Sequence, residues 1–240
     1  MIIILGALMT AQNKSNTFKV LGVLLQYPSE SLIAALGECT NILSSEALLS
    51  KKVTHEIEEL IQHLLQSELL ALEESYVSLF DFKRSLSLHL LEHTYGDSRD
   101  RGQALLDMVA YYEKSGLQLQ PGSMPDFLPI FLEHLSLIPH KKASEVLSCH
   151  VNTIALLEQR LIEHDSAYAA IFTAVKSLSA SKEDQTYVQK AMKNYSQDKD
   201  DNKKLDEQWR EPEVFSNPNA KNKDYLHHDA LQKNNPNGRC

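Results

Sequence analysis

The sequence predicts an all-α protein, a single-domain helical bundle followed by a polar, largely disordered tail. Apolar residues recur at spacings of three and four through residues 17–180, which is the period of an amphipathic helix. Runs that alternate apolar and polar residues, as strands do, are almost absent. The chain has 240 residues, 42% of them hydrophobic, which is enough to bury a core within one domain.

The N-terminal stretch "MIIILGALM" is apolar, but it has no basic region before it and is too short to cross a bilayer. We therefore expect residues 1–15 to form a flexible extension without stable membrane insertion.

In the stretch of residues 17–32, a first predicted helix is stopped by Pro28. Ser29 can then cap a second helix. The apolar stripe of that second helix consists of Leu32, Ile33, Leu36 and Leu43. Residues 56–65 and 68–80 continue with the same period, and each predicts a further helix.

A helix over residues 101–116 follows a break at Gly96, with Asp97 or Ser98 as its cap. Its apolar stripe is Ala104, Leu105, Met108, Val109 and Tyr112, and Lys114 and Gly116 mark its end. Gly102 costs helical stability, so we expect it at a close helix contact that tolerates no side chain.

Three more helices complete the predicted domain, over residues 124–139, 145–163 and 167–180. From residue 181 the character changes, because the last 60 residues hold 8 of the 12 Asn and only scattered apolar side chains. We expect a mostly disordered tail over 181–240, with one short amphipathic segment at 205–215 that can dock. The apolar side chains of this segment are Leu205, Trp209, Val214 and Phe215.

Charge limits the classes of partner. The formal net charge is -8, and residues 1–180 hold 21 acidic against 13 basic side chains, whereas residues 181–240 hold 11 of each. An acidic domain without a basic stripe disfavours nucleic acid. A basic peptide is the better expectation.

The three cysteines, Cys39, Cys149 and Cys240, are far apart and form no C-x-x-C pair. This usage fits a reducing compartment, with Cys39 and Cys149 as small core residues rather than catalytic thiols. Walker-type loops, G-x-S-x-G elbows and G-x-G-x-x-G turns do not occur in the sequence.

One pattern favours a different function. His89, Glu92 and His93 spell H-x-x-E-H, in which two imidazoles on one helical face hold zinc and the acid acts as general base. A helical zinc hydrolase is therefore an alternative, although the third ligand would have to come from a residue such as Glu158 or Glu163. The simpler interpretation is that the neighbouring leucines bury a helix with both histidines at its margin, and that no metal is bound.

Longer motifs carry a resemblance. The stretches "SLFD", "EHTYGDSRDRGQA" and "PDFLPIFLE" resemble the nitrate reductase delta subunit (NarJ-like) assembly chaperones of the wider TorD-like redox-enzyme maturation family. The resemblance covers residues 17–180, and residues 205–215 are similar to the C-terminal segment of the family.

The resemblance implies an all-helical cytoplasmic chaperone that is not an enzyme and holds no cofactor of its own. Its partner would be the N-terminal segment of the nitrate reductase catalytic (alpha) subunit, kept competent for molybdenum cofactor insertion before membrane docking. Such a chaperone is not part of the final enzyme complex, which distinguishes it from a permanent structural subunit.

The resemblance also implies site residues. The matching motif positions, apart from those given a role below, are His93, Arg99, Asp100, Arg101, Gly102, Pro125, Leu128 and Pro129. Among the candidates for peptide binding, Glu92 and Asp126 would pair with a basic residue of the target. The apolar floor would come from Tyr95, Phe127 and Phe131. Each has a structural alternative: Asp126 can cap a helix, Phe131 can belong to the core, and Arg99 can pair with Asp100.

Overall fold

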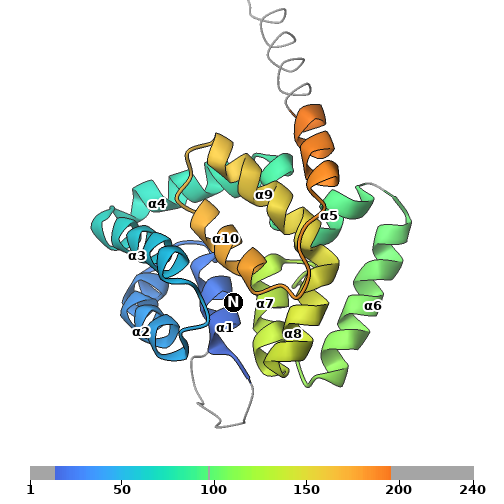
Figure 1. Cartoon of the computed structure of the whole chain (residues 1–240), viewed down its shortest axis with the longest axis horizontal. Coiled ribbons are helices and arrows are strands. Elements are labelled where there is room, and N and C mark those ends of the chain that lie inside the picture. The colour runs from blue at the N-terminus through green and yellow to red at the C-terminus, as the bar shows by residue number, and fades with distance from the viewer. Residues whose placement is uncertain (1–13, 97, 196–240) are drawn as a thin grey trace, which may run out of the picture. The chain divides into compact units, whose positions relative to one another are not determined.

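Helices build the part of the chain that the structure, a computed structural model, describes: residues 14–96 and 98–195 (Figure 1). In order they are α1 (Asn16–Leu24), α2 (Glu30–Glu46), α3 (Lys51–Gln66), α4 (Leu69–Tyr76), the π-helical turn η1 (Val77–Asp81), the 3-10 turn η2 (Arg84–Leu86), α5 (Leu90–Tyr95), α6 (Asp100–Lys114), α7 (Leu128–Leu137), α8 (His140–Leu147), the 3-10 turn η3 (Ser148–His150), α9 (Val151–Glu163) and α10 (Ala169–Ser177). Within the described residues a further helix spans 185–195. The prediction of an all-α fold is confirmed, since the only extended pairing among these residues is one isolated β-bridge.

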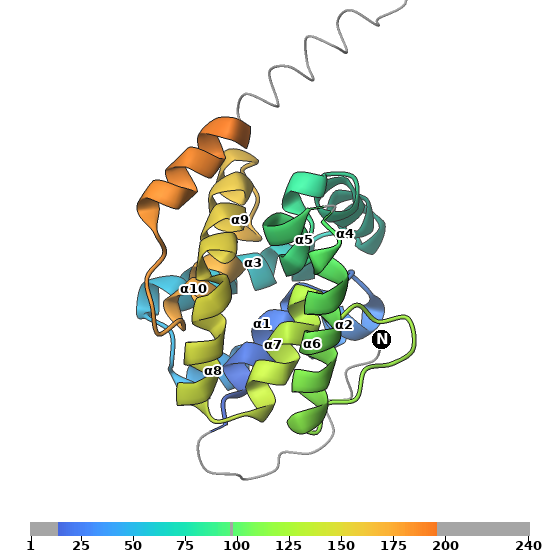
Figure 2. The same ribbon diagram turned by 90° about the vertical axis from the view of Figure 1, so that its right-hand side faces the viewer.

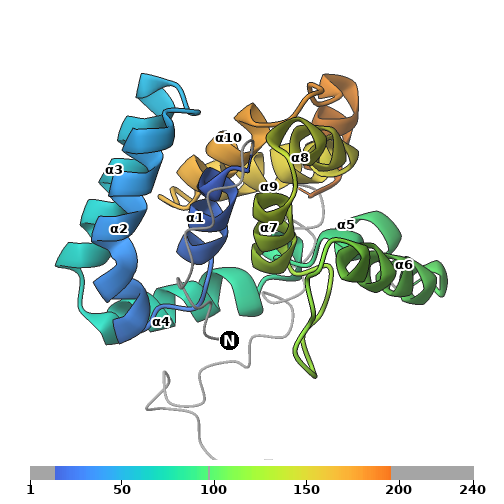
Figure 3. The same cartoon turned by 90° about the horizontal axis from the view of Figure 1, so that it is seen from below.

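α1 lies in the middle of the helical unit, where it packs on α7 and α2 and also contacts α10 (Figure 3). Seven of its nine residues are buried, and Phe18, Leu21 and Leu24 are fully enclosed. Gly22 permits the contact with α7, because a Cβ there would lie 3.0 Å from the Pro129 carbonyl oxygen. This helix pair therefore depends on the absence of a side chain.

The start of α1 is capped from a distance by Glu46, the last residue of α2. Its carboxylate accepts hydrogen bonds from the Asn16 and Thr17 N–H groups at 2.7 and 2.8 Å, and from the hydroxyls of Ser15 and Thr17. Burial opposes ionisation of Glu46, but these four donors lower its pKa overall. A helix that lacks a cap of its own thus has its free N–H groups satisfied by α2.

The predicted boundary between the first two helices is confirmed. α1 ends at Leu24, ahead of Pro28, and the Ser29 hydroxyl accepts a hydrogen bond from the Leu32 N–H at 3.2 Å.

The predicted apolar stripe of α6 faces the rest of the helical unit, but its burial is shallow. Tyr112 is the one buried residue of the helix, the other four members of the stripe are half-buried, and Leu106, outside the stripe, is 65% exposed. A Cβ at Gly102 would meet nothing within 4 Å, so the predicted close contact at this glycine is wrong. At the start of the helix the Asp100 N–H donates to the Ser98 hydroxyl at 3.2 Å, whereas the other predicted cap, Asp97, lies outside the described residues.

α6 is attached to α7 through aromatic rings around His134, and Figure 2 shows α6 on the face of the helical unit that is turned to the viewer. The His134 ring lies 4.6 Å from the Tyr112 ring and 5.0 Å from the Tyr111 ring, between centroids. Both ring nitrogens of His134 are buried without a hydrogen-bond partner among the described residues. Burial, with a smaller contribution from the charge of Lys142, lowers the pKa of His134 to about 4.

The helical unit continues beyond residue 180, where we expected the tail to begin. In the helix at 185–195, Val188 and Tyr195 are buried, and the Tyr195 hydroxyl lies 3.1 Å from His164 Nε2. The Arg160 guanidinium lies 4.7 Å from the centroid of the Tyr195 ring. The boundary at 180 is therefore corrected, because the burial of these two apolar side chains is enough to attach a mostly polar helix to the helical unit. The predicted segment at 205–215 and most of the N-terminal extension lie outside the described residues.

None of the helices in the described part of the chain combines the length and the apolar composition that a bilayer crossing requires.

Candidate functional site

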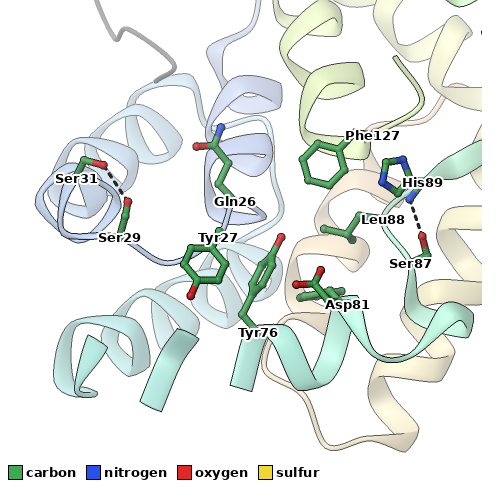
Figure 4. A pocket seen from close by; sticks show the side chains of 11 residues that line it. Gln26, Tyr27, Ser29, Ser31, Tyr76, Asp81, Ser87, Leu88, His89 and Phe127 are labelled. Carbon is green, nitrogen blue, oxygen red and sulfur yellow. Dashed lines mark hydrogen bonds between the residues drawn. The ribbon is translucent and has the colours of Figure 1, made fainter. Parts of the chain in front are cut away.

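A cavity of about 540 Å³ opens between three parts of the helical unit (Figure 4). The first part is the turn from α1 to α2, the second is the end of α4 with η1, and the third joins residues 87–89 to Phe127. The lining residues are Gln26, Tyr27, Ser29, Ser31, Tyr76, Phe80, Asp81, Ser87, Leu88, His89 and Phe127. Four of these residues are aromatic and six carry polar side chains, so the cavity combines an apolar wall with polar groups that can orient a ligand.

Tyr76 fixes the aromatic wall. Its ring lies 4.9 Å from Phe80 and 5.6 Å, edge-on, from Tyr27, between centroids. Its hydroxyl donates to the Leu25 carbonyl at 2.8 Å, so this buried polar group is satisfied by the end of α1. Burial raises the pKa of Tyr76, and the group stays neutral. Tyr27 is 48% exposed and forms the accessible edge of the wall.

The opposite wall is held by the β-bridge between His89 and Phe127. The Leu90 N–H donates to the Asp126 carbonyl at 2.9 Å, and the Leu128 N–H donates to the Leu88 carbonyl at 2.8 Å. These two hydrogen bonds join the segment before α5 to the segment before α7, although the two segments are nearly forty residues apart along the chain.

Asp126 lies behind this wall and is fully buried. Its carboxylate accepts hydrogen bonds from His89 Nδ1 at 3.0 Å and from an Arg101 terminal nitrogen at 3.3 Å. Burial opposes ionisation of Asp126, but the hydrogen bonds from His89 and Arg101 and the positive charge of Arg101 lower its pKa overall. The carboxylate is therefore an internal anchor that ties α6 to the bridge.

Glu92 makes a second anchor on α5. It accepts hydrogen bonds from Arg84 Nε at 2.8 Å and from the Ser87 hydroxyl at 2.7 Å, and these contacts lower its pKa against the effect of burial. His93 Nε2 donates to the Ser87 carbonyl at 2.8 Å, and burial lowers the pKa of His93. Glu92 and His93 together hold residue 87, and hence the cavity wall, in place.

The H-x-x-E-H pattern does not lie on one helical face. His89 precedes α5, and its Nδ1 is directed at Asp126, whereas His93 and Glu92 are directed at Ser87. This corrects the expectation that both imidazoles share one face of a helix. Among the residues that the structure describes, no group of three His, Cys, Asp or Glu side chains is placed to hold a metal ion.

The two other acids that were candidates for a third zinc ligand, Glu158 and Glu163, belong to no metal-binding group within the described residues. Glu158 is buried and bonds to Thr173 and to Lys176. Glu163 is exposed at the end of α9.

The structure brings only part of the predicted peptide site together. Phe127 lines the cavity, and Tyr95, at the end of α5 and 38% exposed, does not. Phe131 is 2% exposed and Asp126 is fully buried, so neither side chain is accessible to a peptide here. The direct role predicted for these two residues is corrected: Phe131 fills the core and Asp126 pairs internally.

The remaining motif positions divide into two groups. Pro125, Leu128 and Pro129 are buried, and the Pro125 carbonyl accepts a hydrogen bond from the Tyr112 hydroxyl at 2.8 Å. Arg99, Asp100 and Gly102 are exposed at the start of α6, and within the described residues Arg99 and Asp100 form no ion pair.

Of the cavity residues, sequence reasoning named Phe127 alone as a peptide contact, and it missed among others Gln26, Tyr27, Tyr76 and Asp81. A signal for two of them was present, since Gln26 and Tyr27 directly precede the helix-ending Pro28 and so must lie in a turn. Asp81 was visible only as the last letter of "SLFD".

Cys39 shows no sign of activation. Cys39 is buried, and burial raises the pKa of its thiol to about 11, which keeps it protonated. Cys149 is exposed rather than in the core, which corrects its predicted burial, and Cys240 lies outside the described residues.

Comparisons with known proteins agree on one family. Residues 46–174 match the family model described as nitrate reductase delta subunit. The chain is 36% identical over 204 residues to the "Probable nitrate reductase molybdenum cofactor assembly chaperone NarW" of Escherichia coli (strain K12), covering 84% of both chains. It is 35% identical to the "Nitrate reductase molybdenum cofactor assembly chaperone NarJ" of the same strain, covering 80% of both.

A solved structure shares the fold. It comes from Archaeoglobus fulgidus and is described as a redox enzyme maturation protein, with a TM-score of 0.51 and 22% identity, over 71% of this chain and 96% of that one. At this level of identity the likeness shows the fold alone.

Proposed function

This chain belongs to the nitrate reductase delta subunit family, and from that premise we propose that it is an assembly chaperone for a nitrate reductase. The chaperone binds the N-terminal segment of the apo catalytic (alpha) subunit and keeps it competent for molybdenum cofactor insertion before membrane docking. It acts in the cytoplasm, catalyses no reaction, and leaves before the final complex is complete.

The observation that carries the proposal of peptide binding is the aromatic cavity. Its exposed edge, Tyr27, and its opposite wall, Phe127, belong to different parts of the chain, so a segment placed between them is held from two sides. A buried apolar side chain contributes about 1.5–3 kcal/mol through the hydrophobic effect. Two or three such side chains in the cavity would give specific but reversible binding, which an assembly chaperone requires because it must release its target.

Charge supports a target that is basic as well as apolar. The net charge of -8, concentrated in residues 1–180, attracts Lys and Arg at long range and speeds encounter. Because salt screens exposed charges over about 8 Å at physiological ionic strength, binding should weaken as salt rises. The apolar contribution should remain.

The test is a calorimetric titration of the purified chain with a synthetic peptide copying the first residues of the nitrate reductase catalytic subunit. We expect binding at low salt, weaker binding at high salt, and a loss of about three- to tenfold in Tyr27→Ala, which removes a half-exposed aromatic contact. Leu106→Ala is the matched control, because it removes an exposed apolar side chain on α6, away from the cavity.

Absence of binding to the wild-type chain at low salt would overturn the proposal. Equal losses in Tyr27→Ala and Leu106→Ala would place the peptide elsewhere on the surface.

A further inference from the structure

The helix that carries Asp81 to the cavity ends in a π-helical turn. α4 passes directly into η1, where the Phe82 N–H donates at 3.1 Å to the carbonyl of Val77, five residues back. π-Helical turns are rare and appear frequently at functional sites. Here the turn keeps Phe80 buried against Tyr76 and leaves the next residue, Asp81, exposed at the cavity wall.

Asp81 differs from the two carboxylates that the sequence pattern favoured. Asp126 and Glu92 each accept two hydrogen bonds from side chains of this domain. Asp81 makes no hydrogen bond or ion pair with the residues that the structure describes. The cavity therefore holds a carboxylate that has no ion-pair partner among the described residues.

The surroundings of Asp81 suit an organic cation. Figure 4 shows Asp81 next to Tyr76, whose ring lies between Asp81 and Tyr27 in this view. After burial, the negative charge of Asp81 is among the causes that raise the pKa of both tyrosines, so its field reaches the aromatic wall. A Lys or Arg side chain in this position gains both the carboxylate and the faces of the aromatic rings.

The same cavity offers one unsatisfied donor. Gln26 Nε2 is buried without a hydrogen-bond partner among the described residues, although Gln26 lines the cavity. A buried amide donor without an acceptor is costly, and such atoms in folded proteins commonly mark the place of a water or a ligand. A peptide backbone carries the carbonyl that this donor lacks.

We propose that Asp81 is the residue that selects a basic side chain in the target segment, while Gln26 donates to a carbonyl of the same segment and Tyr27 and Phe127 hold its neighbouring apolar residue. This assignment rests on the proposed function. It replaces the two buried or paired carboxylates, Asp126 and Glu92, as the acidic contact.

The first experiment compares Asp81→Asn with Asp107→Asn in the same calorimetric titration. Both changes remove one negative charge from an exposed helical position, and the Asp107 contact with Gln103 can be kept by Asn. We expect Asp81→Asn to weaken binding about three- to tenfold and to reduce the dependence on salt, and Asp107→Asn to change the affinity by less than about twofold. Melting curves of both variants establish that they are folded.

The second experiment locates the pair. The basic residues of the peptide are replaced by Gln one at a time, and each peptide is titrated into wild type and Asp81→Asn. One replacement should weaken binding to wild type several-fold and leave binding to Asp81→Asn almost unchanged, which is the signature of two groups in contact.

The outcomes separate the two proposals. If wild type binds the peptide and every Gln replacement costs the same factor in wild type and Asp81→Asn, then Asp81 is not the selecting residue, although the chaperone function stands. If wild type does not bind the peptide at all, both proposals are overturned together.

Discussion

α1 and α6 belong to the same helical unit, but their surroundings are opposite. Seven of the nine residues of α1 are buried, and Gly22 brings its backbone against α7. One of the fifteen residues of α6 is buried, and Gly102 has nothing near it. Both helices carry an apolar stripe at helical spacing. The period of apolar residues thus predicts that a helix forms, whereas the depth to which the helix is buried depends on how many neighbouring elements the fold supplies.

The largest expected effect concerns the attachment of α6 to α7 at His134. Its folded pKa of about 4 lies below the usual value near 6.5, so the unfolded state binds the proton first as pH falls. Neutral His134 contributes fully to the free energy of unfolding above pH 6.5. This contribution, about 3 kcal/mol at most, is lost as the pH falls from 6.5 to about 4.

The measurement is the free energy of unfolding by urea at several pH values, for wild type and His134→Phe. The phenyl ring keeps the aromatic contacts with Tyr111 and Tyr112 and cannot be protonated. Wild type should lose more stability than the variant between pH 6.5 and 4. A constant offset between the two proteins across this range would show that His134 does not titrate as its burial indicates.

The next effect concerns Gly22. Gly22→Ala places a methyl group 3.0 Å from a backbone oxygen and 3.2 Å from the Leu132 Cβ, and neither can move without shifting α7. We expect a destabilisation of about 1–3 kcal/mol, typical of overpacking. Thermal and urea unfolding should agree on the sign. An unchanged or increased stability would mean that α1 and α7 are less closely packed than the structure shows.

The smallest effect has the opposite sign. Gly102→Ala adds a methyl group where nothing lies within 4 Å, in a helical position, so it should stabilise the protein by up to about 1 kcal/mol through helix propensity. With Gly22→Ala it forms a matched pair, the same substitution in a buried and an exposed helix. A loss of stability in Gly102→Ala would show that α6 is closely packed at Gly102 after all.

The sequence predicted the class of fold and most helix positions, because helical spacing, Pro28 and Ser29 act locally. It did not predict the site. The carboxylates Asp126 and Glu92 stand out in the motifs, but their partners Arg101 and Arg84 reach them only through the tertiary fold. Asp81 is inconspicuous in sequence, and its position depends on a π-helical turn whose extra residue leaves no mark in the apolar pattern.

The packing of α1 on α7 also has a consequence for biosynthesis. Gly22 and its neighbour Pro129 are roughly 100 residues apart, so the contact that buries α1 is distant in sequence and slow to close. While the chain is being synthesised, α1 emerges from the ribosome before α7 and keeps its apolar surface exposed until α7 has followed. A protein that we propose to bind the N-terminal segment of an apo enzyme subunit thus contains a helix that itself needs protection during translation.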